Sequence, residues 1–264
     1  FVNPSSATAT KIVFSSGNMS SGTVTHHENW NFVTTSSETY FAQSHKCLMK
    51  GMISHSQDIA TYTNFINTCQ SKIKIAPESD ISVYFIPGDG TDAYKQIKTA
   101  INTSKSVDLI SHRFSNSTII ENLTTKLEDT RKPKVRFIGD DDLYWTSVYR
   151  KGMGRNTTFE WYKIRDLINV GMDTKYIETY ADDVFEPKSM QLQHNKFLIF
   201  HFDKKGAVFT GAGNLTISAF KQNFENFYYI TIPEVYDAFA NQYNYLWFKL
   251  GKSHSELPTK LELP

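Results

Sequence analysis

The segment Gln193-His194-Asn195-Lys196 leads directly into four apolar residues, Phe197-Leu198-Ile199-Phe200. This apolar run predicts a short buried strand that begins close to Lys196. Because successive side chains of a strand point to opposite faces, we expect His194 and Lys196 on the same face. The pair combines an imidazole, which can attack an electrophile or donate a proton, with an ammonium group that can neutralise an anion.

The residues that follow predict a hairpin that returns to the same place. Lys204-Lys205-Gly206 has the composition of a turn, and Ala207–Thr210 forms a second apolar run. The returning strand would carry Asn214 back beside His194 and Lys196. A fixed ammonium and an amide can hold the oxygens of a phosphodiester while the imidazole acts on its phosphorus or its leaving group.

Length and composition set wide limits. The chain has 264 residues, 40% of them hydrophobic, and a formal net charge of +1. This length allows one large domain or two small ones. Because the net charge is small, any polyanionic partner must be bound by a local patch. The cysteines, Cys47 and Cys69, fit either one disulfide in an exported protein or two free buried thiols.

A stretch near the N-terminus repeats the pattern around Asn214. Ile12–Asn18 matches Val208–Asn214, and Glu28-Asn29-Trp30 matches Glu225-Asn226-Phe227. Each copy reads as a strand, a Gly-Asn turn, a loop with a glutamate, a second strand and a helix. A duplication of this length predicts two related structural units and is poorly explained by chance.

Strands and helices alternate through most of the remaining chain. The predicted strands are 81–86, 106–111, 134–138 and 173–177, and the predicted helices are 38–52, 58–72, 91–104, 118–129, 158–169 and 233–249. This alternation favours an α/β fold, a layered αβα sandwich around a mixed β-sheet. The linker Pro77-Glu78-Ser79-Asp80 divides the chain into residues 1–76 and residues 77–264.

Together, these motifs resemble those of the phospholipase D superfamily of phosphodiesterases, which join His-x-Lys to a Gly-Asn turn and a later glutamate. Residues from Ile81 to the closing helix carry the resemblance. In that superfamily two half-sites meet across a pseudo-twofold axis, built from two lobes of one chain or from a homodimer. The resemblance therefore implies two related lobes here. The first, residues 1–76, would be incomplete, and the second, residues 77–264, carries His-x-Lys.

The sequence departs from the family pattern at several positions. His201 replaces the motif aspartate, with Asp203 two residues later, and Ala212 replaces a serine that is present in the first copy as Ser16. His194-Asn195-Lys196 is also the only His-x-Lys in the chain. The half-site missing from the first lobe would then come from an N-terminal polypeptide, cleaved or on another chain, or from a homodimer partner.

The resemblance implies a role for each matched residue. His194 would be one of two catalytic histidines, one attacking phosphorus to form a phosphohistidine and the other protonating the leaving alcohol. Lys196 and Asn214, with Asn18 from the first copy, would hold the non-bridging oxygens of the phosphate.

The two glutamates would act on the imidazoles. Glu225 and Glu28 would each orient a histidine ring, and Ser16 would donate a supporting hydrogen bond. No cofactor is implied, because fixed cations neutralise the phosphate. A metal-dependent hydrolase is a weaker alternative, and its ligands would be His26, His27, His194, His201 and Asp203.

Two other stretches carry charge. Residues 144–165 interleave aromatic side chains such as Trp145 with cations such as Arg150. This mixture is typical of single-stranded nucleic acid binding, of a lipid headgroup interface, or of a solvated helix face over a core. The run Gly139-Asp140-Asp141-Asp142 follows a predicted strand and favours a solvated acidic loop, with a cation site as the alternative.

We therefore expect a metal-independent phosphodiesterase, acting on nucleic acid as a nuclease. A phospholipase D that hydrolyses or transphosphatidylates phospholipids is the alternative. The missing half-site also leaves open a non-catalytic, phosphate-binding pseudoenzyme chain. A composition rich in Ser, Thr and Asn, together with the option of a disulfide, favours a secreted or lumenal location.

Overall fold

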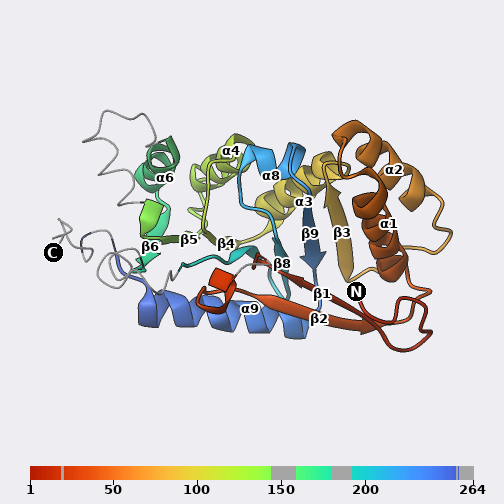
Figure 1. Ribbon diagram of the computed structural model, residues 1–264. Coiled ribbons are helices and arrows are strands. Elements are labelled where there is room, and N and C mark those ends of the chain that lie inside the picture. Colours follow the sequence, from red (N-terminus) through yellow and green to blue (C-terminus); the bar gives the residue numbers. More distant parts are fainter. Residues whose placement is uncertain (19–20, 144–158, 180–191, 254, 256–264) are drawn as a thin grey trace.

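A computed structural model describes residues 1–18, 21–143, 159–179, 192–253 and 255. A seven-stranded sheet forms its centre, and helices cover both faces of the sheet (Figure 1). The strands of the sheet are β3 (Ile81–Ile86), β4 (Ser106–Ser111), β5 (Val135–Asp140), β6 (Asp173–Ile177), β7 (Lys196–His201), β8 (Gly206–Gly211) and β9 (Glu225–Ile230). Two further strands, β1 (Thr10–Ser15) and β2 (Trp30–Thr35), form a separate pair.

The sheet is mixed, as the sequence predicts. Its strand order is β3-β9-β8-β7-β4-β5-β6. Strands β4, β5 and β6 run parallel, whereas every other neighbouring pair is antiparallel. Strand β7, which follows the His-x-Lys motif, therefore lies in the middle of the sheet and is buried along nearly its whole length. Its apolar run reflects burial on both faces.

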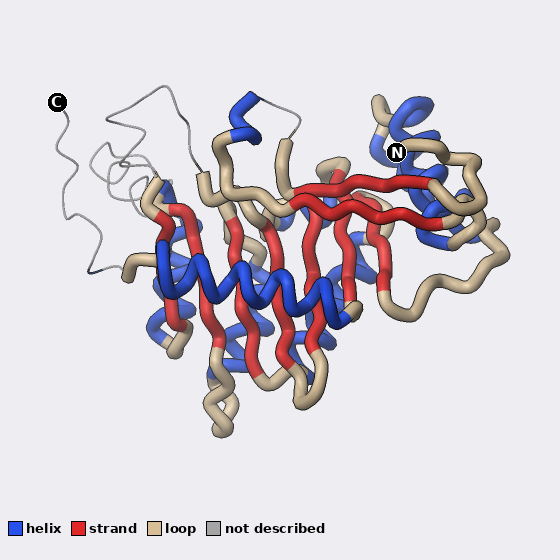
Figure 2. Tube along the Cα trace, turned by 90° about the horizontal axis from the view of Figure 1, so that it is seen from below, coloured by secondary structure: helices blue, strands red, loops and turns tan. Residues whose placement is uncertain are grey.

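Helices pack on both faces of the sheet and confirm the predicted αβα sandwich. Helices α3 (Gly90–Thr103), α4 (Ser117–Leu127), α6 (Phe159–Asn169) and α8 (Ile217–Lys221) cover one face. Helix α9 (Pro233–Tyr245) crosses the other face and continues into a π-helical turn, Leu246–Leu250 (Figure 2). In the described part of the chain, no helix has the length and apolar character needed to cross a membrane.

Alternate residues of the strands pack into two separate apolar cores, one on each face of the sheet. Leu198 of β7 packs into the core beneath α3, α4, α6 and α8, whereas its neighbours Phe197 and Ile199 pack against α9. Successive side chains of a strand point to opposite faces, so a continuous apolar run suits a strand that has a helical layer on each side. Helix α8 was not predicted, because five residues are too few to display a helical period.

Polar side chains fix where several helices begin. The Thr39 side chain accepts a hydrogen bond from the backbone of helix α1 (Tyr40–His55), and Asp58 does the same for α2 (Ile59–Ser71). Asn116 caps α4 in the same way. Such caps stabilise a helix by about 1 kcal/mol each, since they satisfy N–H groups that have no partner inside the helix. These residues explain why the helices begin close to their predicted bounds.

The internal repeat is visible in the strand pairing. In the first copy, Ser15 of β1 lies opposite Trp30 of β2; in the second, Gly211 of β8 lies opposite Phe227 of β9. These four residues are equivalent in the sequence repeat. The two copies therefore form antiparallel pairs in the same register.

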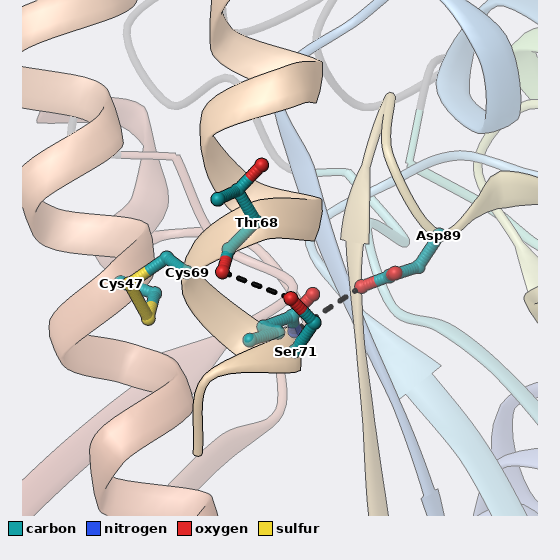
Figure 3. The surroundings of a disulfide bond; sticks show 6 residues. Cys47, Thr68, Cys69, Ser71 and Asp89 are labelled. Carbon is teal, nitrogen blue, oxygen red and sulfur yellow. Dashed lines mark hydrogen bonds between the residues drawn. A yellow bond between two sulfur atoms is a disulfide. The ribbon is translucent and has the colours of Figure 1, made fainter.

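Helices α1 and α2 lie side by side at the β3 end of the sheet (Figure 1). A disulfide between Cys47 of α1 and Cys69 of α2 joins them, as Figure 3 shows. The structure thus selects the disulfide over two free thiols. The division of the chain into lobes at residue 77 stays a prediction.

Candidate active site

The centre of the candidate site is the start of strand β7. Lys196 is its first residue and lies opposite Ser111 of β4, and His194 precedes it by two positions. The two side chains lie on one side of the strand, with Nζ of Lys196 3.0 Å from each ring nitrogen of His194. His194 is 6% exposed and Lys196 is 3% exposed, so both lie largely out of bulk water.

Backbone hydrogen bonds hold the first copy of the repeat against this motif. The amide of His27 donates to the carbonyl of Leu192 over 2.8 Å, and the amide of His194 donates to the carbonyl of His27 over 3.1 Å. The side-chain amide of Asn195 donates to the same carbonyl over 2.9 Å. Segments that are 166 residues apart in the sequence are thereby fixed side by side.

Glu28 is the carboxylate that contacts His194. Its Oε1 accepts a hydrogen bond from Nδ1 of His194 over 2.7 Å, and its Oε2 accepts one from the hydroxyl of buried Ser16 over 2.5 Å. Burial by itself raises the pKa of Glu28, but these hydrogen bonds and the charges of His194 and Lys196 outweigh it and lower the pKa overall. An ionised Glu28 favours a proton on Nδ1, which leaves Nε2 as the nitrogen that can attack or transfer a proton.

Lys196 is held by backbone carbonyls. Its Nζ donates to the carbonyl of Ser16 over 3.0 Å and to that of His194 over 2.8 Å. Burial lowers the pKa of Lys196 to about 7, although Glu28 and Glu225 act in the opposite direction. A phosphate bound beside this amine would favour its charged form, because the anion replaces part of the lost hydration.

Asn214 and Glu225 come from the second copy of the repeat. Asn214 lies in the turn after β8, and its Oδ1 is buried without a hydrogen-bond partner in the described part of the chain. Glu225 begins β9, and its Oε1 accepts a hydrogen bond from Asn223 over 3.1 Å. Burial raises the pKa of Glu225, partly offset by Asn223 and Lys196. Both side chains thus carry polar atoms that a bound phosphate or imidazole could satisfy.

The other predicted residues are less closely placed. Asn18 is exposed, and its carbonyl accepts a hydrogen bond from Thr23. Trp145 and Arg150, predicted to bind substrate, lie outside the described residues. Of the residues predicted to act on the phosphate or on an imidazole, those that the described part of the structure brings into contact with His194 or its partners are Ser16, Glu28 and Lys196.

The sequence analysis missed His112, which follows β4. Its ring centroid lies 5.2 Å from that of His194. Nε2 of His112 is buried, 3.4 Å from Oδ2 of Asp142. Burial lowers the pKa of His112, partly offset by Asp142. An isolated histidine carries no motif, and its place is set by the antiparallel pairing of β4 with β7.

The acidic loop after β5 is buried, so the prediction of a solvated loop was wrong. Oδ2 of Asp140 accepts hydrogen bonds from the Gln193 amide over 2.5 Å and from the Thr179 hydroxyl over 2.7 Å. Oδ2 of Asp142 accepts one from Arg113 over 2.8 Å. Burial and the neighbouring carboxylates raise the pKa of Asp140 well above its usual value. Through the Gln193 amide, the acidic run contacts the backbone that leads directly into the His-x-Lys motif.

The metal cluster expected by the weaker alternative does not form. Nε2 of His201 lies 2.8 Å from Oδ2 of Asp108, and its Nδ1 lies 2.7 Å from the hydroxyl of Tyr236. Asp203 lies beyond the end of β7 and pairs with Lys105. These residues are engaged at the opposite end of β7, away from His194.

A different set of side chains lies close enough to share an ion. In the part of the chain that the structure describes, His26, Glu28 and His194 offer ligand atoms within 4.8 Å of one another. The ring centroid of His26 lies 5.3 Å from that of His194. His194 therefore has a histidine neighbour from the first copy of the repeat as well as His112.

The chain is similar to a known protein family in sequence and to solved proteins in structure. The family described as "Cardiolipin synthase, PLD-like domain" matches residues 95–247, more than half of the chain. The sequence matches no curated protein. Among solved structures, phosphatidylserine synthase from Haemophilus influenzae Rd KW20 has a TM-score of 0.55 at 12% identity, over 92% of this chain and 60% of that one. This likeness shows a shared fold.

Two smaller proteins are also similar. The phospholipase D family member Nuc from Salmonella typhimurium has a TM-score of 0.49 at 21% identity, over 65% of this chain and 95% of that one. NucT from Helicobacter pylori has a TM-score of 0.47 at 16% identity, over 65% of this chain and 98% of that one.

Proposed function

Because the chain belongs to the phospholipase D superfamily, we propose that it is a metal-independent phosphodiesterase that works through a phosphohistidine. The observation that carries the proposal is the buried cluster of His194, Glu28 and Lys196. Glu28 holds one ring nitrogen of His194 at 2.7 Å, and Lys196 supplies a cation 3.0 Å from the ring. An oriented imidazole can attack phosphorus or transfer a proton, and a fixed cation beside it can stabilise the charge of the phosphate without a metal.

The proposed reaction has two steps. One imidazole attacks phosphorus, a nitrogen–phosphorus bond forms, and the bond to the leaving oxygen breaks while a second imidazole donates a proton to that oxygen. Water or another alcohol then attacks the phosphorus of the phosphohistidine, an oxygen–phosphorus bond forms, the nitrogen–phosphorus bond breaks to release the histidine, and the second imidazole takes the proton of the attacking group. Lys196 and the amides of Asn214 and Asn18 would hold the non-bridging oxygens throughout. His194 fills one of the two histidine roles.

We propose that the second imidazole comes from another His-x-Lys segment outside these 264 residues, either covalently joined to them or on a separate polypeptide, or from a second copy of the chain. Strand β8 is paired on both edges, by β7 and β9. Its repeat equivalent β1 pairs with β2 on one edge, whereas on the other the described residues contribute a single bridge, Val2 to Lys11. A strand equivalent to β7 would pair with this edge of β1. Glu225 would then orient the second imidazole, as Glu28 orients His194.

Nucleic acid is the substrate class that we place first. The support is the mixture of cations and aromatic side chains in residues 144–165, which suits phosphate neutralisation and base stacking. In α6, Arg165 lies 4.8 Å from the ring centroid of Tyr162, an arrangement of the same kind. Phospholipid is the second candidate, favoured by the description of the matching family.

The test is a substrate panel in excess EDTA. The chain is incubated with single-stranded DNA, double-stranded DNA, RNA and phosphatidylcholine vesicles, alone and with the candidate second half-site, and compared with His194→Asn. We expect EDTA-resistant cleavage of nucleic acid that His194→Asn abolishes. Cleavage of vesicles alone would select the phospholipase alternative. Phosphate binding without cleavage in any combination would select the non-catalytic chain, and loss of activity in EDTA with recovery in zinc would overturn the proposal.

We also propose that the protein is secreted or lumenal. The Cys47–Cys69 disulfide supports this, because disulfides persist in oxidising compartments. Fractionation of the native source, with a thiol-reactive probe added before lysis, tests it. Recovery of the chain in the cytosol with both thiols reduced would contradict the proposal.

A further inference from the structure

One ring nitrogen of His26, Nδ1, is buried without a hydrogen-bond partner in the described part of the chain. The His26 side chain is 9% exposed. The nearest acidic atom is Oε1 of Glu28, at 3.5 Å. Burying an unsatisfied imidazole nitrogen is unfavourable, so a group that bonds to it has a stabilising effect. That nitrogen points at the carboxylate that already contacts His194.

The second copy of the repeat has asparagine at the position equivalent to His26. Two residues before Glu225, the second copy has Asn223, whose side-chain amide donates to Oε1 of Glu225 over 3.1 Å. Two residues before Glu28, the first copy has His26, with Nδ1 3.5 Å from Oε1 of Glu28. An amide would suffice to steady the glutamate. The histidine adds a nitrogen lone pair, which an amide lacks.

The three groups form the donor set of a transition-metal site. His26 supplies an imidazole nitrogen, Glu28 a carboxylate oxygen and His194 a second imidazole nitrogen, all within 4.8 Å of one another. Two histidines and one carboxylate are a known ligand set of zinc, and ligand atoms about 3.3 Å apart fit tetrahedral bonds of about 2.0–2.1 Å. The 3.5 Å between His26 and Glu28 fits this spacing, and the 2.7 Å between Glu28 and His194 must open slightly.

We propose that His26, Glu28 and His194 bind a divalent transition metal ion such as zinc, and that the bound metal inhibits the enzyme. The ion takes the place of the proton between Glu28 and His194, and that proton leaves to solvent. Glu28 then no longer orients the ring, and the lone pair of one His194 nitrogen is used by the metal. The inhibition rests on the proposed function, whereas the binding does not.

The ammonium group of Lys196 limits the affinity. Its Nζ lies 3.0 Å from both ring nitrogens of His194, so a metal ion and the charged amine repel each other at close range. We therefore expect reversible binding that a chelator removes, unlike a structural zinc site. Magnesium and calcium should bind poorly, since both prefer oxygen ligands.

Binding is tested first, on the full chain without a polyhistidine tag and without substrate. Equilibrium dialysis against zinc, with the metal measured by elemental mass spectrometry, should give one ion per chain. The His26→Asn variant should not bind this zinc ion, because asparagine lacks the imidazole nitrogen that serves as a ligand. Asparagine is chosen because it can keep the hydrogen bond to the glutamate that Asn223 makes in the second copy. His55→Asn, at the end of α1, is the matched control and should bind zinc as the wild type does. Equal binding by wild type and His26→Asn, with both folded by circular dichroism, overturns the site.

Inhibition is tested next, on whichever substrate the panel identifies. Zinc at a concentration that saturates the dialysis curve should lower kcat about tenfold or more, the scale of losing a positioned proton-transfer group, and EDTA should restore it. His26→Asn should retain the metal-free activity and resist zinc. Binding that His26→Asn abolishes, with unchanged wild-type turnover, would overturn the inhibitory role while leaving the phosphodiesterase proposal intact.

Discussion

Replacing Lys196 by methionine tests the electrostatics of the site, because it removes a buried charge and keeps the length of the side chain. The pKa of Lys196 is lowered to about 7 by burial, from an ordinary value of 10.5. The folded state therefore disfavours the charged form. Below about pH 7 this destabilisation is fully present. Between pH 7 and 10.5 the unfolded chain still binds the proton that the folded chain has released, so stability rises with pH.

The size of the effect follows from linkage. Each pH unit between the two pKa values changes the unfolding free energy by about 1.4 kcal/mol. From pH 7.5 to 9.5 the wild type should gain about 2.5 kcal/mol relative to Lys196→Met. Loss of the hydrogen bonds to the carbonyls of Ser16 and His194 also changes the stability of the variant. That contribution does not vary with pH, so it cancels from the pH-dependent difference.

The assay is urea unfolding of both proteins at several pH values, followed by circular dichroism. Titrating groups that do not interact with Lys196 affect both proteins equally, and Lys98→Met, at an exposed position of α3, controls for loss of an ordinary lysine. Inorganic phosphate should stabilise the wild type more than Lys196→Met at pH 7.5, because it pairs with the charged amine. Parallel stability curves for wild type and Lys196→Met would refute the lowered pKa and the role assigned to burial.

Three further predictions concern the two glutamates and the disulfide. Glu28→Gln should lower kcat about ten- to a thousandfold with little change in KM, because it alters the partner of His194 rather than a substrate contact. An unchanged kcat in steady-state kinetics would show that Glu28 has a purely structural role. Glu225→Gln should have a comparable effect in an assembly that contains the second half-site, and an unchanged kcat in that assembly would argue against the assignment. Replacing both Cys47 and Cys69 by alanine should lower the unfolding free energy by about 3 kcal/mol, as measured by denaturant titration. The reason is that the disulfide closes a loop across 22 positions and so restricts the unfolded chain.

Much of the fold could be predicted because its causes are local. The apolar run Phe197–Phe200 indicated a buried strand, and β7 occupies Lys196–His201. The repeated Gly-Asn turns and glutamates predicted two related hairpins, and β1–β2 and β8–β9 pair in the same register. Hydrophobic periodicity and turn residues act over a few positions, so they can be read from the chain directly.

The acidic loop shows where local reasoning fails. Three consecutive aspartates predict solvation when considered alone, because burying a charge without partners is strongly unfavourable. In the structure Asp140 accepts hydrogen bonds from Thr179 and Gln193, and Asp142 pairs with Arg113. These partners come from distant segments, so their presence could not be inferred from the loop itself.

By itself, the sequence determined which chemical groups the site contains: the His194–Lys196 pair on one strand face, and the duplicated asparagines and glutamates. Only the tertiary structure decided which groups touch. Glu28 contacts His194 across 166 residues, and His26 and His112 reach the same ring from other elements. The physical reason is that strand order and backbone pairing between remote segments, such as residues 26–29 with residues 192–195, fix these contacts. Such pairing depends on the packing of the whole sheet and leaves no local pattern in the chain.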